Sequence, residues 1–223
     1  MKIQLGLVMM VGILFTHLNN NLIVVDAIKV SSVVTPSFFN SIINQASSSC
    51  KGKHFYTRAG FLNAAKAFPK FGSGSTLAAK REIAAFFAHA THETGRKSPD
   101  LLRLYLHQVL SKYRCKAKSY HGRGPIQLTW NCNYGAAGKY LGLDLLKHPE
   151  LASTNPSVSF KTALWYWNTR VHSKVSKGFG ATIRAINGGE CDGGSPAAVK
   201  NRVKYYKNYC KKFKITPGPN VSC

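Results

Sequence analysis

The placement of prolines constrains the fold of this chain more than any other sequence feature. A polar residue followed by proline favours a helix start, because the polar side chain caps free N–H groups and proline has no N–H to leave unpaired. Three such pairs stand ahead of runs with helical spacing of apolar residues: Ser98-Pro99, Asn155-Pro156 and Ser195-Pro196. We therefore expect a helix to begin at each pair.

Apolar periodicity predicts further helices over residues 38–46, 59–68 and 78–94, the last ending at Gly95. The stretch YHGRGPIQLTWNCNYG, residues 120–135, has no clean period and many glycines, so we expect loops and a short strand pair there. No internal repeat or long linker is visible. The sequence thus predicts a mainly α protein with one compact domain.

Residues 1–27 have the features of a secretory signal. Lys2 precedes an apolar run from Ile3 to Phe15, and Val25-Asp26-Ala27 is an acceptable cleavage site. The apolar run is too short for a membrane span. We expect cleavage near Ala27, secretion to the extracellular space, and a folded domain over residues 28–223.

The charge is strongly positive. Of 31 basic and 8 acidic residues only Lys2 and Asp26 precede residue 28, so 30 basic and 7 acidic residues remain beyond the signal. Such a field favours anionic partners (nucleic acid, pectin-like polymers, phosphorylated glycans or acidic membranes), and it equally fits a basic face that meets only solvent. Any carboxylate chemistry must use Glu82, Glu93, Asp100, Asp144, Glu150, Glu190 or Asp192.

All six cysteines follow the signal: Cys50, Cys115, Cys132, Cys191, Cys210 and Cys223. An exported chain with six cysteines is expected to hold disulfides, although the count alone does not fix the pairing. No CxxC motif or Cys/His cluster suggests zinc, and we expect no metal. His89 and His92 stand three residues apart without a third ligand, so we interpret them as helix-surface histidines.

Glu93 lies at the edge of the apolar stripe of the helix predicted over 78–94. A carboxyl group beside apolar side chains is a candidate general acid, because desolvation raises its pKa. The alternative is a carboxylate that points into solvent at a helix end.

Arg202 falls inside the apolar arc of the helix that follows Pro196. A buried arginine needs a carboxylate partner, and the candidates are Glu93, Glu190 and Asp192; a surface arginine that extends into solvent is the alternative. A different arc carries Lys200, Lys204, Lys207, Lys211 and Lys214. That arc is either a solvated face or a contact surface for anionic polymers or membranes.

Aromatic residues suited to stacking on sugars gather in two places. Trp165, Tyr166 and Trp167 lie in a helical run, where the spacing assigns Trp167 to the core. Trp130 lies in the glycine-rich stretch and is the better candidate to face a ligand. Asn187, ahead of two glycines, fits a helix stop.

Five segments in order resemble the plant family-19 chitinases: KREIAAFFAHATHETG, GRGPIQLTWNCNYGAAG, VSFKTALWYW, GFGATIRAINGGECDG and NRVKYYKNYC. The resemblance spans about residues 31–223, is nearest to the compact class IV type, and does not include a cysteine-rich chitin-binding module. It implies a two-lobed, lysozyme-like fold around a central cleft, with disulfides and without a cofactor. It also implies hydrolysis of β-1,4-linked N-acetylglucosamine polymers with inversion, which needs two carboxyl groups about 6.5–9.5 Å apart.

The resemblance also implies roles for residues at matching positions. Glu93 takes the place of the proton donor, Arg202 and Glu190 that of the charge network holding it, and Thr129 that of the residue that positions water. Four residues match positions that contact sugar: Gln127, Asn133, Lys161 and Asn187. Cys191 and Cys223 match a family disulfide.

The segment after Gly95 departs from the family pattern. The class IV pattern has its general base, a glutamate, where this chain has Leu102, and the nearby acid is Asp100. Asp100 is either a substitute base or a first-turn residue that favours the helix dipole. Ser98 replaces a cysteine expected to pair with Cys50, which leaves a Cys50–Cys115 bond as an option, and Cys132 replaces an aromatic sugar contact.

We therefore expect a secreted chitinase-like hydrolase whose activity is reduced or lost if no base is present. The alternatives are a catalytically silent chitin- or wall-binding defence protein and a cationic antimicrobial protein. The expected partners are chitin-type oligosaccharides and anionic wall or surface polymers. We expect a monomer with no nucleic-acid partner.

Overall fold

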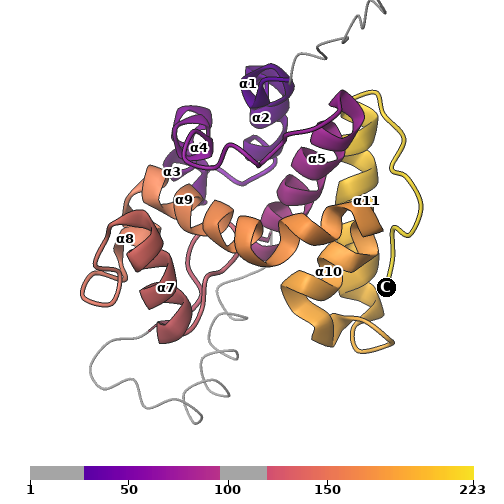
Figure 1. The fold of residues 1–223 in the computed structure, drawn as a ribbon. Helices are drawn as coiled ribbons and strands as arrows, with labels where there is room; N and C mark the ends of the chain where they lie inside the picture. The colour runs from indigo at the N-terminus through magenta and orange to yellow at the C-terminus, as the bar shows by residue number, and fades with distance from the viewer. Residues whose placement is uncertain (1–27, 96–119) are drawn as a thin grey trace, which may run out of the picture.

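The computed structural model describes residues 28–95 and 120–223, and this part of the chain is mainly helical (Figure 1). The longer helices are α2 (Pro36–Ile43), α4 (Arg58–Ala65), α5 (Thr76–Glu93), α7 (Asn131–Leu141), α9 (Pro156–Tyr166), α10 (Phe179–Asn187) and α11 (Pro196–Lys212). Short helical turns are α1 (Val30–Val33), α3 (Gly52–Phe55), α8 (Leu151–Thr154), η1 (Trp167–Val171), η2 (His172–Lys177) and η3 (Gly188–Glu190). The predicted mainly α class is confirmed.

Two of the predicted helix starts at proline lie in the described residues, and both are confirmed. Pro156 opens α9, where the Asn155 side chain accepts hydrogen bonds from the backbone N–H groups of Ser157 and Val158. Pro196 opens α11, but the Ser195 side chain makes no capping hydrogen bond there. The helix predicted to start at Pro99 lies outside the described residues.

The prediction for residues 120–135 is partly wrong. Instead of the expected strand pair, this stretch has a single antiparallel bridge, between Arg123 and Leu128. The last residues of the stretch instead begin α7 at Asn131. Glycines at 135 and 138 disguised the helix; Gly138 is required because a Cβ would lie 2.5 Å from the Leu143 carbonyl oxygen.

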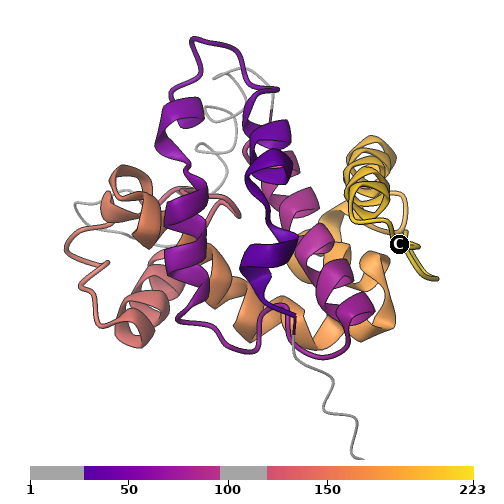
Figure 2. The same ribbon diagram turned by 90° about the horizontal axis from the view of Figure 1, so that it is seen from above.

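The helices form two lobes joined through α9. On one side α4, α7 and α8 pack against α9, and on the other α5, α10 and α11 pack against one another. Figure 1 shows α7 and α8 at one flank and α10 and α11 at the other, and Figure 2 shows the same separation from above. This agrees with the two-lobed architecture that the resemblance implies.

Helix α5 is the centre of the core. All eight residues from Ile83 to Ala90 are buried, so the helix is covered on every side rather than along the single predicted stripe. Its alanines explain the difference, because small side chains let neighbouring helices approach from several directions. Trp167 is fully buried, as predicted.

A buried carboxylate on α5 ties three segments together. Glu82 accepts hydrogen bonds from the Gly72 backbone N–H and the Trp167 indole N–H, both at 2.9 Å, and its Oε1 lies 2.6 Å from His172 Nδ1. Glu82 is therefore committed to the architecture and is not available for catalysis.

The C-terminal segment returns to α10. Cys191 and Cys223 form a disulfide, as the resemblance implied, and the Gly180 N–H donates to the Asn220 carbonyl. A Cβ at Gly180 would lie 2.0 Å from the Ser222 carbonyl oxygen, so this close approach requires glycine. Among the described residues, no helix is both long enough and apolar enough to cross a membrane.

Candidate active site

Glu93 is the last residue of α5, and α11 brings an arginine to it. The Nη2 atom of Arg202 donates a 2.5 Å hydrogen bond to Glu93 Oε1. The Arg202 side chain is 1% exposed and the Glu93 side chain is 20% exposed. Glu93 thus reaches the surface from an environment that is otherwise closed, instead of pointing freely into solvent.

A second carboxylate holds the same arginine. Glu190, on η3, accepts hydrogen bonds from Arg202 Nε through Oε2 and from Arg202 Nη2 through Oε1, both at 2.7 Å. Asp192, the third partner considered from sequence, instead forms an exposed ion pair with Arg184. The buried cation is therefore shared by Glu93 and Glu190.

His89 completes the surroundings of Arg202, and its predicted place on the helix surface is wrong. The ring is fully buried, with Nδ1 3.0 Å from Arg202 Nη1 and Nε2 2.9 Å from Thr182 Oγ1. The Thr182 hydroxyl donates to the Phe179 carbonyl. Its oxygen must therefore accept from Nε2–H, which leaves Nδ1 to accept from the arginine.

The environment keeps His89 neutral. Burial, and then the positive charge of Arg202, hold the pKa of the ring well below its usual value. A neutral ring that accepts from Arg202 adds no charge to the cluster. The guanidinium thus has a fixed orientation, with Nη2 shared between the two carboxylates.

The two carboxyl groups differ in proton affinity. Burial raises the pKa of Glu93, and the nearby Glu190 adds to this, although Arg202 opposes both. Burial also acts to raise the pKa of Glu190, but the hydrogen bonds and charge of Arg202 outweigh it and the pKa is lowered. The higher proton affinity of Glu93 suits a proton donor, and the lower proton affinity of Glu190 suits a group that stays ionised.

Side chains from α10 and α5 contact Glu190 and hold it in place. The Asn187 amide donates a 2.9 Å hydrogen bond to Glu190 Oε1, and His92 Nε2 lies 3.9 Å from the same oxygen. Asn187 therefore ends α10 and also orients the anion. His92 and His89 contact different partners and do not converge on a shared point.

Tyr166 on α9 is a neighbour of Glu93 that sequence reasoning placed only in a general aromatic set. Burial raises the pKa of its phenol, Arg170 lowers it and the charge of Glu93 raises it further. Its hydroxyl lies 3.5 Å from the Ala185 carbonyl oxygen. The helical run WYW gave no signal that its middle member faces this site.

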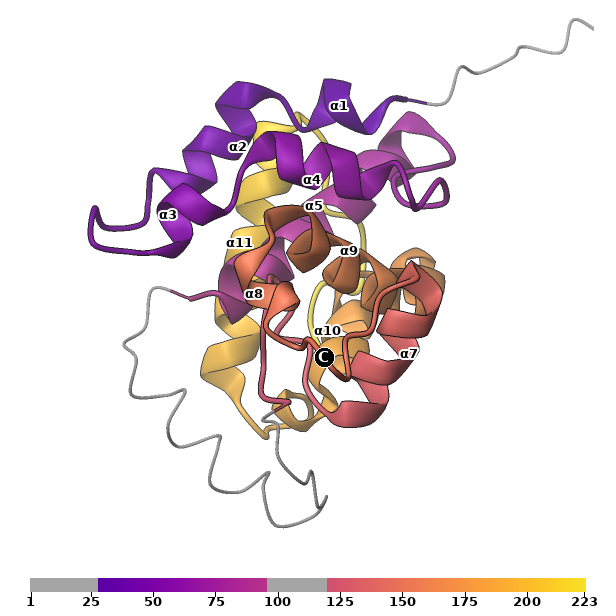
Figure 3. The same cartoon turned by 90° about the vertical axis from the view of Figure 1, so that its left-hand side faces the viewer.

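A second group of predicted site residues lies on the segment from 120 to 133. The Thr129 hydroxyl donates to the Gln127 carbonyl, and the Asn133 amide donates to the Thr129 carbonyl. Gln127 and Trp130 have φ angles of 53° and 80°, backbone states rare for residues with side chains. Figure 3, like Figure 1, shows this segment passing near the C-terminal end of α5.

Comparison with known proteins identifies the family of this arrangement. The family described as Glyco_hydro_19, Chitinase class I, matches residues 33–100, 104–177 and 172–223. The chain belongs to the family-19 glycoside hydrolases. A curated Arabidopsis thaliana relative, Endochitinase At2g43590, is 52% identical over 87% of this chain and 75% of its own length. Chitinase 4 of Oryza sativa is 50% identical over 88% of this chain and 72% of its own length.

Solved structures agree with this family membership. The class IV chitinase of Zea mays covers 86% of this chain and 98% of its own, with 44% identity and a TM-score of 0.76. Chitinase C from Streptomyces griseus covers 86% of this chain and 80% of its own, with 40% identity and a TM-score of 0.73. Family-19 chitinases from a plant and a bacterium therefore share the fold described above.

Lys161 and the cysteines Cys50, Cys132 and Cys210 take no part in the hydrogen bonds described for Arg202 and Glu190. Lys161 lies on α9, partly exposed and about one and a half turns before Tyr166. Asp100, the proposed substitute base, lies outside the described residues, as do Leu102, Ser98 and Cys115. Cys50 and Cys132 are exposed free thiols, and Cys210 is a buried one.

Proposed function

We propose that this family-19 hydrolase cleaves β-1,4-linked N-acetylglucosamine polymers, with Glu93 as the proton donor. The observation that carries the proposal is the hydrogen-bonded set of Glu93, Arg202 and Glu190. It places a carboxyl group of raised pKa and a carboxyl group of lowered pKa on one buried guanidinium. The endochitinase names of the curated relatives support the same substrate class.

In the proposed reaction, Glu93 gives its proton to the glycosidic oxygen as the bond from that oxygen to C1 of the sugar breaks. A water attacks C1 from the opposite face and gives a proton to a base, so that the anomeric configuration inverts. Arg202 stabilises the carboxylate that Glu93 becomes. Thr129 is proposed to orient the water, and the sugar contacts proposed from the resemblance and the loop position are Gln127, Trp130, Asn133, Lys161 and Asn187.

Glu190 is a poor candidate for the base, although it is the other carboxylate of the cluster. Both of its oxygens accept hydrogen bonds from Arg202, and Asn187 donates to one of them. Its lowered pKa also weakens it as a proton acceptor. We propose instead that Asp100, the acid that follows Gly95 in the sequence, is the base.

We also propose that the chain is exported, because its N-terminal segment has the features of a secretory signal.

Hydrolysis of chitin oligomers by the purified protein tests the assignment of Glu93. Glu93→Gln should lower the rate by roughly 10²–10⁴-fold, the usual contribution of one acid–base group, while oligomer binding persists. Glu150→Gln is the matched control, because it makes the same chemical change at an exposed glutamate that pairs with His148 and not with Arg202. Equal activity of Glu93→Gln and the unaltered protein would reject Glu93 as the donor.

Separate measurements test Asp100 as the base and inversion as the stereochemical outcome of the reaction. Asp100→Asn should reduce the rate by a similar factor, and NMR of the first product should show the α-anomer, as inversion requires. An unchanged rate in Asp100→Asn would remove Asp100 from the mechanism. Oligomer binding without turnover in the unaltered protein would instead favour the silent wall-binding role.

A further inference from the structure

A hollow at the far end of α5 from Glu93 has no place in the proposed reaction. It has a volume of about 380 Å³ and lies between the α1–α2 corner and the junction of α5 with α11. Its walls include hydroxyl-bearing residues around α1 and α2, the rings of Phe38 and Phe213, and the lysines Lys80, Lys212 and Lys214. Lys80 precedes Glu93 by 13 residues of helix, which places the hollow about 20 Å from the proposed proton donor.

Three lysines face this hollow and no acidic residue of the described chain lines it. Lys80 donates to the Phe213 carbonyl at 3.3 Å, which leaves further donors on its ammonium group. Lys212 and Lys214 have no ion-pair partner among residues 28–95 and 120–223. Unpaired positive charge around a concave surface favours an anionic ligand.

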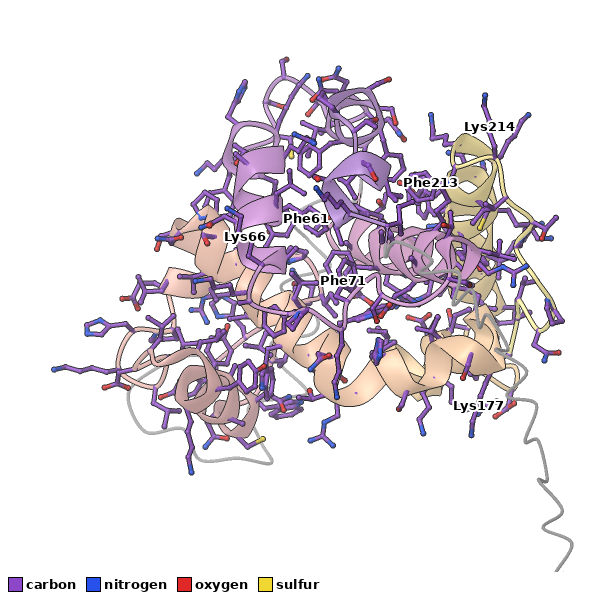
Figure 4. All side chains as sticks on the ribbon, turned by 45° about the horizontal axis from the view of Figure 1, so that its top comes forward. Phe61, Lys66, Phe71, Lys177, Phe213 and Lys214 are labelled. Atoms are coloured by element: carbon purple, nitrogen blue, oxygen red, sulfur yellow. A yellow bond between two sulfur atoms is a disulfide. The ribbon has the colours of Figure 1, made fainter. Side chains whose placement is uncertain are left out.

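The remaining walls match a sugar better than a bare ion. Four hydroxyl-bearing residues around α1 and α2 line the hollow: Ser32, Thr35, Ser37 and Ser41. The hydroxyls of Ser32 and Ser41 donate to backbone carbonyls and can still accept, and that of Thr35 accepts from the Phe38 N–H and can still donate, so these groups can hydrogen-bond the hydroxyls of a sugar. The rings of Phe38 on α2 and Phe213 after α11 pack with centroids 4.4 Å apart, and their small exposed edges supply an apolar surface at the base of the hollow. Figure 4 shows Phe213 turned inward and Lys214 at the outer end of α11.

The hollow continues into a basic surface. Lys200, Lys204, Lys207 and Lys211 recur every three or four residues on α11, and all are exposed, as predicted. Lys214, expected from the sequence on the same arc, instead lies just past the end of α11 with a φ angle of 55°, and it lines the hollow. An extended polymer with repeated negative charges can therefore contact both features together.

We propose that this hollow binds a carboxylate-bearing sugar unit of an acidic polysaccharide, and that the α11 lysines hold the adjoining units. The chemistry is that of a polyuronate: one carboxylate and several hydroxyls on each ring. A membrane is the poorer fit, since the large exposed apolar side chains of the described chain, Leu77, Tyr140 and Leu146, do not line the hollow. The site is separate from hydrolysis and does not depend on it.

Calorimetric titration with a galacturonate oligomer of defined length tests the proposal. The double variant Lys212→Gln/Lys214→Gln should lower affinity by about tenfold or more, because two charge-assisted contacts are lost. The control Lys174→Gln/Lys177→Gln removes the same charge from exposed residues of η2, and Figure 4 shows Lys177 far from Lys214. It should lose less than about threefold, the effect of the general field alone. Equal losses in the two variants would overturn the proposal.

A third variant separates loss of binding from loss of folding. Ser37→Asp places a carboxylate in the hollow, at the first turn of α2, where negative charge favours the helix. Its melting temperature should hold while its affinity for the oligomer falls, and unchanged affinity would contradict the site. Inorganic phosphate competing at the same concentration as galacturonate, or vesicles of anionic lipid binding in preference to the oligomer, would also overturn the assignment to a polyuronate. Chitin-oligomer hydrolysis should be unchanged in all three variants, so the outcome is independent of the proposed activity.

Discussion

At the scale of single residues, Arg202 determines how the candidate active site is arranged. One buried guanidinium binds two carboxylates and a neutral imidazole, so a change in any partner changes the others. Buried ion pairs often add little net stability when compared with apolar replacements, but removal of one partner is costly because a charge is left uncompensated. The contribution of this cluster to the stability of the protein is therefore best measured by replacing one partner of Arg202 at a time.

Glu190→Gln should destabilise the protein by about 3 kcal/mol at neutral pH, because Arg202 then keeps Glu93 as its single anionic partner. The pKa of Glu190 is lowered by folding, so its stabilising effect is present above the unfolded value of 4.5 and is lost as pH falls through the folded value. Urea unfolding at several pH values should show the difference from the unaltered protein shrinking in acid. Asp192→Asn, which removes an exposed ion pair, should change stability little at any pH.

The pKa of Glu93 is shifted upward, opposite to the shift of Glu190, and this affects the pH dependence of the proposed reaction. Folding favours the protonated form, so the proposed donor should keep its proton at pH values where an ordinary glutamate, at 4.5, has lost it. The alkaline limb of kcat/KM on chitin oligomers should therefore lie above pH 4.5 and report this group. An alkaline limb at or below that value would contradict the environment described for Glu93.

At the scale of secondary-structure elements, the starts of α9 and α11 offer a direct comparison. Both begin at proline, but Asn155 caps α9 with two side-chain hydrogen bonds and Ser195 makes none to α11. The same pair of a polar residue and proline therefore stabilises the start of α9 through a side-chain cap and the start of α11 without one. Proline fixes where each helix begins, whereas the cap contributes only where its side chain meets the free N–H groups.

Asn155→Ala should lower the free energy of unfolding by about 1 kcal/mol through loss of the cap. Ser195→Ala should cost much less, because no side-chain hydrogen bond is removed. Chemical denaturation of the two variants, measured beside the unaltered protein, gives the comparison directly. A larger loss in Ser195→Ala would show that the capping geometry described here is incorrect.

At the scale of the whole molecule, the C-terminal segment holds together the elements of the lobe formed by α5, α10 and α11. The Cys191–Cys223 disulfide spans 32 residues and fixes this segment beside α10 and η3, the elements that carry Asn187 and Glu190. The segment thus supports the site without contributing a reacting group. The disulfide therefore links the stability of the protein to the orientation of Glu190, the residue next to Cys191.

The double variant Cys191→Ser/Cys223→Ser should lose about 2–4 kcal/mol of stability, because the unfolded chain regains the freedom that the cross-link removes. Cys132→Ser, at an exposed free thiol, is the control and should leave the unfolding midpoint unchanged. Guanidinium unfolding without reductant measures both. No difference between the double variant and the control would show that the cross-link is not a source of stability.

The sequence was informative where a residue type conflicts with its apolar surroundings. The position of Arg202 in an apolar arc gave burial as one of two alternatives and named three candidate carboxylates, and the structure confirms burial with Glu93 and Glu190 but not Asp192 as partners. His89 gave no such signal, since its partner Thr182 lies 93 residues away and a histidine suits surface and core alike. The start of α7 was missed because its composition is typical of loops and its packing against α9 decides the conformation. The roles of Thr129, Gln127, Asn133 and Lys161 rest on the family pattern and stay predictions.

The span between Glu93 and Arg202 has a consequence for biosynthesis. The two residues are 109 positions apart, so the ribosome makes α5 well before the helix that covers its end. At about 5–20 residues per second, this interval lasts roughly 5 to 20 s. Throughout it, the apolar surface of α5 that faces α11 lacks its native cover, and a nascent chain in this state is a natural client for chaperones.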